Sequence, residues 1–78
     1  MAKITEFFPS STDSSKPHPT SVECGYQIVR SLNEILLQLS TYGSDDRRSQ
    51  KKVSQTIQLD RERAAELVKI IKDTFPGI

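Results

Sequence analysis

The stretch from Thr20 to Tyr42 constrains this chain more than any other. Its apolar residues recur at intervals of three and four, which is the spacing of one face of a helix. Those residues are Val22, Tyr26, Val29, Leu32, Leu36 and Leu39. Thr20 and Glu23 have the spacing of a capping box, and Gly43 is a typical helix-ending residue. The pattern predicts an amphipathic helix over about 21–42.

The apolar face of this expected helix is unusually wide. Ile28, Ile35 and Leu37 extend it to about 220° at 100° per residue, whereas a surface helix needs a stripe of little more than about 100°. A second helix of ordinary width covers about half of that face. We therefore expect a partner or a second copy of the chain to cover the rest. The residues assigned to self-association are Ile28, Leu32, Ile35 and Leu39.

A second helix is expected near the C-terminus, over about 60–75. Its apolar stripe is interrupted by no glycine or proline before Pro76 and Gly77. Residues 53–59 fit either a short strand or an N-terminal extension of this helix. The strand is favoured, because Asp60 then caps the helix instead of lying unpaired in its apolar face.

The expected fold is therefore mainly α, with two amphipathic helices packed as a hairpin. Residues 1–19 form a flexible N-terminal arm, and residues 20–78 form one small helical domain. The arm contains SSTDSSKPHPT, a serine- and proline-rich segment without hydrophobic periodicity that is typical of a linker.

Size and composition favour association. A chain of 78 residues buries too little surface to be very stable alone, and its single cysteine, Cys24, cannot form an internal disulfide. Cys24 and the lone His18 also fall short of a standard zinc site. We expect a homodimer without cofactor or metal.

The formal net charge of +1 gives no global attraction to nucleic acid, and no apolar run is long enough to cross a membrane. The N-terminus lacks the pattern of a signal peptide. These features favour a cytoplasmic or nuclear location over secretion.

Nothing in the sequence has the pattern of a catalytic site. No nucleophile has a matching histidine and acid, and the three glycines form no phosphate-binding loop. Glu62 and Glu66 are one helical turn apart, which suits ion pairs with neighbouring basic residues rather than acid–base chemistry. We expect a non-enzymatic interaction or regulatory protein.

The N-terminal octet, MAKITEFF, resembles a PIP box, the peptide through which replication and repair proteins bind the sliding clamp PCNA. Ile4, Phe7 and Phe8 match the aliphatic and two aromatic positions, and Met1 stands where the family has glutamine. The resemblance implies that these three side chains dock into a hydrophobic pocket of a clamp. The alternative is that they fold back onto the chain's own apolar face.

Residues 51–71 resemble the strand and first helix of ribbon-helix-helix DNA-binding dimers. That resemblance implies a small dimeric DNA-binding regulator, in which strand side chains read the major groove and basic side chains lie near phosphates. The nucleic-acid-binding residues would be Arg47, Arg48, Lys51, Lys52, Ser54, Thr56 and Gln58.

Overall fold

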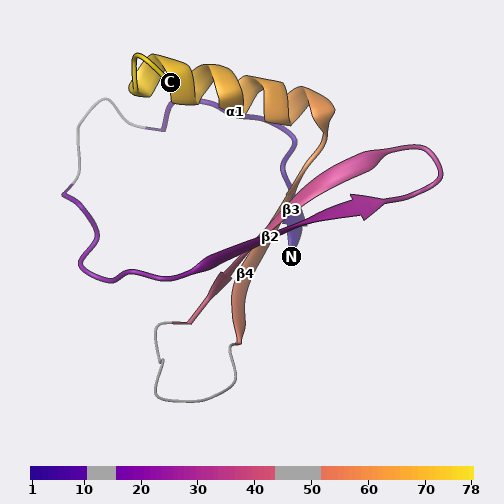
Figure 1. Ribbon diagram of the computed structural model, residues 1–78, viewed down its shortest axis with the longest axis horizontal. Coiled ribbons are helices and arrows are strands. Elements are labelled where there is room, and N and C mark those ends of the chain that lie inside the picture. The colour runs from indigo at the N-terminus through magenta and orange to yellow at the C-terminus, as the bar shows by residue number, and fades with distance from the viewer. Residues whose placement is uncertain (11–15, 44–51) are drawn as a thin grey trace.

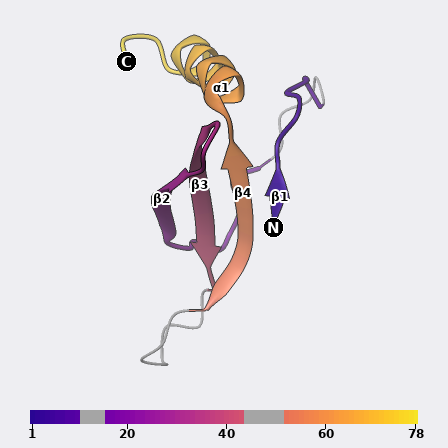
Figure 2. The same ribbon diagram turned by 90° about the vertical axis from the view of Figure 1, so that its right-hand side faces the viewer.

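The computed structural model describes residues 1–10, 16–43 and 52–78. Its elements are β1 (Ala2–Lys3), β2 (Cys24–Arg30), β3 (Ile35–Tyr42), β4 (Val53–Leu59) and α1 (Arg61–Thr74). The strands form a mixed four-stranded sheet in the order β1-β4-β3-β2, and α1 follows β4 directly. Figure 2 shows the strands side by side, with α1 beyond the end of β4.

The mainly α fold expected from the sequence is wrong. The stretch over 21–42 is not a helix but an antiparallel pair of strands, β2 and β3, so there is no helical hairpin in the described residues. The apolar spacing of three and four arises because the helical pattern mixes residues from both faces of two strands. Tyr26, Ile28 and Val29 are aromatic or β-branched residues that suit a pleated surface.

The turn between β2 and β3 spans Ser31 to Glu34. The Ser31 amide donates to the Glu34 carbonyl at 2.9 Å, and the Ser31 hydroxyl donates to the same oxygen at 3.2 Å. At the other end of the hairpin, the Tyr42 amide donates to the Glu23 carbonyl at 3.0 Å. These two bonds continue, at the ends of the hairpin, the register that places Gln27 opposite Gln38.

That register decides which backbone N–H and C=O groups of β2 bond to β3 and which point away from it. Bonded pairs alternate along an antiparallel ladder, so the odd-numbered residues of β2 bond inward to β3. The N–H and C=O groups of Ile28 and the other even-numbered residues point outward from the edge of the sheet. Among the described strands, none pairs with this outer edge of β2.

The C-terminal half follows the favoured expectation from the sequence. Residues 53–59 form β4, which pairs antiparallel with β3, and the helix expected over 60–75 is present as α1. The Asp60 carboxylate accepts a hydrogen bond from the Arg63 amide at 2.8 Å and so caps the helix. Gly77 has a φ of 101°, which glycine adopts without strain, just after α1 ends.

The N-terminal segment is held against the body of the protein at two points. Residues 2–3 pair in parallel with Ile57 and Gln58 of β4, and the Ile4 amide donates to the Gln58 carbonyl at 2.9 Å. Further along, the Arg63 guanidinium donates to the Thr5 carbonyl at 3.0 Å. Figure 1 shows this segment continuing along α1.

α1 projects away from the sheet instead of lying flat on it (Figures 1 and 2). None of its residues is buried. Among the described residues, the buried apolar side chains are Leu36 and Leu59, the latter 1% exposed. A single copy of this fold therefore has a very small core.

Candidate interaction surface

One face of the sheet is apolar. The strand registers place Tyr26 opposite Leu39 and Ile57, and Ile28 opposite Leu37 and Leu59, so that these rows cross β2, β3 and β4. Directly opposite residues of paired strands point to the same side of a sheet. We call this side the apolar face; its residues are Tyr26, Ile28, Ile35, Leu37, Leu39, Ile57 and Leu59.

The apolar face is largely uncovered. Tyr26 is 78% exposed, Ile28 56% and Ile35 58%. Tyr26 and Ile28 lie opposite Leu39 and Leu37, whereas Ile35 lies opposite Arg30 at the margin of this face. Scattered apolar residues on a surface need no explanation, but a contiguous group of them marks an interaction site. The exposed residues lie toward β2 and the β2–β3 turn, away from the well-covered Leu59.

An open groove of about 1050 Å³ lies between the apolar face and α1. The sheet contributes Ile35, Leu37 and Leu59 to it. The helix contributes Ala64, Ala65 and Val68, and the turn at 31–34 closes one end. Its walls are mostly apolar, and the small alanine side chains leave room for another element to approach the helix closely.

The opposite face of the sheet carries a row of glutamines. Gln27, Gln38 and Gln58 are in register, and the side-chain amide of Gln58 donates from Nε2 to the side-chain Oε1 of Gln38 at 2.8 Å. In the next row, the hydroxyls of Ser40 and Thr56 lie 3.1 Å apart. The Gln38–Gln58 and Ser40–Thr56 pairs therefore bond within the polar face.

The residues predicted to bind nucleic acid fall partly on this polar face. Thr56 and Gln58 point to it but are hydrogen-bonded to Ser40 and Gln38, and Ser54 lies two residues earlier in β4, exposed. Lys52 is exposed just before β4. Arg47, Arg48 and Lys51 lie outside the described residues.

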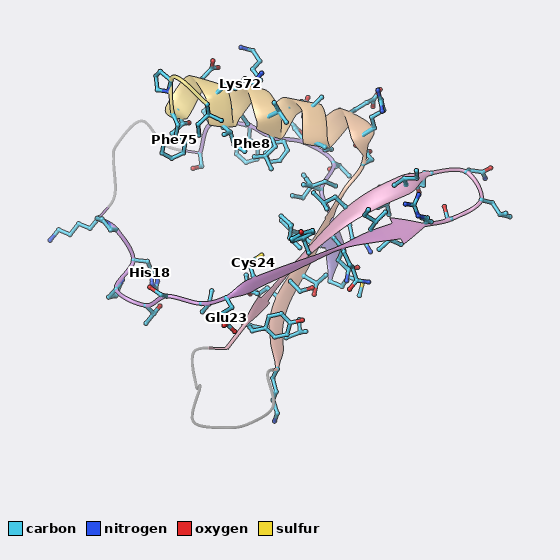
Figure 3. The ribbon with its side chains drawn as sticks, viewed as in Figure 1. Phe8, His18, Glu23, Cys24, Lys72 and Phe75 are labelled. Carbon is cyan, nitrogen blue, oxygen red and sulfur yellow. The ribbon has the colours of Figure 1, made fainter. Side chains whose placement is uncertain are left out.

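The residues predicted to dock into a partner do not form one free surface. Ile4 and Phe7 are half-buried, while Phe8 is 70% exposed. Figure 3 shows Phe8 and Phe75 both beneath α1. The segment would have to leave β4 and release Arg63 before all three side chains could enter a pocket elsewhere.

The residues predicted for self-association are distributed differently. Ile28, Ile35 and Leu39 all belong to the apolar face, whereas Leu32 lies fully exposed in the turn. The predicted self-association set left out Tyr26 and Leu37, although both belong to the predicted helical face, and it also left out Ile57, Ala65 and Val68. Alternation within 24–30 and 35–42 was the signal that could have placed Tyr26 and Leu37 on one face of a sheet.

The remaining singled-out residues are not gathered into a site. Cys24 is exposed at the start of β2, and the His18 ring Nδ1 lies 2.9 Å from the Thr20 hydroxyl on a separate segment (Figure 3). Glu66 pairs with Arg63 at 2.9 Å. Within the described ranges, no group of three metal-binding side chains comes together.

Comparisons with protein families, with curated proteins and with solved structures gave no match to this chain. Over the parts of the chain that the structure covers, no helix is long and apolar enough to span a membrane.

Proposed function

We propose that this chain is a small non-enzymatic interaction protein, and that its apolar face binds a protein surface, in the first place that of a second copy. The observation that carries the proposal is the contiguous exposure of Tyr26, Ile28 and Ile35 on one side of the sheet. Burying such side chains is the main source of free energy in protein association.

The small core supports the same proposal. A domain of this size seldom gains more than about 3–5 kcal/mol from a single core, even when that core is well filled. Here Leu36 and Leu59 are the buried apolar side chains among the described residues. A second copy packed on the apolar face would supply the missing burial.

The N-terminal motif remains a second way in which the chain could bind a partner. Phe8 is exposed, and the segment before it is held only by the edge of β4 and by the Arg63–Thr5 hydrogen bond among the described contacts. The apolar face is favoured over this motif because it is already exposed, whereas docking of Ile4 and Phe7 requires their displacement from half-buried positions.

Two neighbouring residues of β2 give a matched test. Ile28 points to the apolar face and Gln27 to the polar face, and both are exposed in one copy. We expect Ile28→Asp to weaken self-association at least about tenfold, because a carboxylate at the interface would be desolvated. Gln27→Asp should leave the association constant nearly unchanged.

The measurement is sedimentation equilibrium over a range of protein concentrations, with circular dichroism to verify the fold of each variant. The proposal predicts a wild-type dimer that Ile28→Asp dissociates. A wild-type chain that stays folded and monomeric throughout, or equal effects of the two substitutions, would overturn it.

A further inference from the structure

The groove beside α1 identifies how two copies would fit together. We infer that in the pair formed through the apolar faces, α1 of each copy lies against the groove of the other, so that two antiparallel helices close one end of the assembly. This inference rests on the proposed function and adds the element that occupies the groove.

The total exposed area of the chain leaves room for such an occupant. The chain exposes 7275 Å², whereas a compact monomer of its mass is expected to expose about 4,800 Å². The excess is about 2,500 Å² per copy by that estimate. If half of it is buried on pairing, two copies bury about 2,500 Å², which lies within the range of obligate homodimers.

The length and direction of α1 decide where it must lie. Two sheets packed face to face are separated by about 10 Å, whereas 14 helical residues extend for about 21 Å. α1 projects from the same side of the sheet as its apolar face (Figures 1 and 2). When the two apolar faces meet, the C-terminal half of α1 therefore extends past its own sheet to that of the second copy.

The chemistry of the helix agrees with this position. Ile71 and Phe75, in the C-terminal part, are exposed in one copy and would gain apolar contacts on the second sheet. Ala65 and Val68 form the wall of the groove, and side chains of this size allow helix axes to approach to about 8 Å.

Symmetry supports the same arrangement. In a two-fold dimer, the same surface of each copy forms the interface, so every contact occurs twice. α1 forms one wall of the groove of its own copy and also carries an exposed apolar flank. With that flank it can enter the groove of the other copy. Arg63, on the opposite side of the helix, remains bound to Thr5 of its own chain.

The test uses single cysteines in a Cys24→Ser background of the full chain. Ala65→Cys and Val68→Cys place a thiol on the groove side of α1, and Glu66→Cys places one on the far side as a control. Facing helices bring Cα atoms within the range that a disulfide requires. After mild oxidation, we expect a non-reducing denaturing gel to show a disulfide-linked dimer for position 65 or 68 and an uncross-linked chain for position 66.

The outcomes separate this inference from the proposed function. If sedimentation shows a dimer that depends on Ile28, but neither Ala65→Cys nor Val68→Cys cross-links faster than Glu66→Cys, the helix placement is wrong and the interaction surface stands. If the wild-type chain is a monomer at all concentrations, both are overturned.

Discussion

The Arg63 guanidinium donates from Nη1 to the Thr5 carbonyl at 3.0 Å, joining two residues that are 58 positions apart. The same side chain pairs with Glu66 at 2.9 Å through Nε and is only 21% exposed. Arg63 thus fixes the N-terminal segment to the first turn of α1.

Arg63→Ala should loosen this segment. We expect hydrogen exchange of the Ile4 amide to accelerate about threefold to tenfold, because opening of residues 2–4 would no longer break a charged hydrogen bond. Glu66→Gln is the control, since it removes the ion pair and leaves the bond to Thr5. Equal acceleration in both variants would show that the ion pair, and not the Thr5 contact, holds the segment.

Leu59→Ala should be strongly destabilising. Leu59 is the most completely buried side chain in the described part of the chain, and truncation of such a residue costs about 2–5 kcal/mol. Leu32→Ala, in the exposed turn, should change the free energy of unfolding by less than about 0.5 kcal/mol. Urea unfolding at one fixed protein concentration gives both values, and similar losses would contradict the described burial.

The cap at Asp60 should contribute measurably to the stability of α1. Asp60→Ala removes the acceptor of the Arg63 amide, and loss of an N-cap costs about 1 kcal/mol. Asp60→Ser should recover most of that loss, because serine can accept the same bond. Thermal unfolding followed by circular dichroism would measure both, and a serine variant no better than alanine would argue against the cap.

The direction of the amides in β2 can be tested with proline. Gln27→Pro removes an N–H that bonds inward to Gln38, whereas Ile28→Pro removes one that points outward from the edge. We expect the Gln27 variant to unfold more readily, by roughly 1 kcal/mol or more. Urea unfolding would decide, and a larger loss at Ile28 would mean that the outward edge is itself bonded in solution.

The C-terminal half of the fold could be predicted because its signals are local. Asp60 caps α1 within three residues, and Pro76 and Gly77 follow the helix closely. The β-branched residues of 53–59 likewise identified a strand, since the alternative left the Asp60 carboxylate unpaired on an apolar face.

The β2–β3 hairpin was missed because its apolar residues fit two periods at once. Val29 and Leu36 are seven residues apart, as on one helix face, yet they are paired across the sheet. Thr20 and Glu23 suggested a helix cap, but the Thr20 hydroxyl instead lies against His18. The Ser31–Glu34 turn contains no glycine or proline, so no strong local signal divided the segment.

The candidate surface was only partly foreseeable for the same reason. Ile28, Ile35 and Leu39 were selected as one helical face and do lie together, but on a sheet. The groove depends on how α1 leaves β4, and a sequence does not specify that angle through any short-range pattern.

The parallel pairing of β1 with β4 has a consequence for how the protein is made. Ala2 lies opposite Ile57, so residues 2–3 are synthesised well before the strand with which they pair and can join the sheet only after β4 has been made. Closing so long a loop for a two-residue strand carries a high entropic cost, which places this step late in folding. Residues 2–3 are thus translated before β4 but reach their native position only after it has formed.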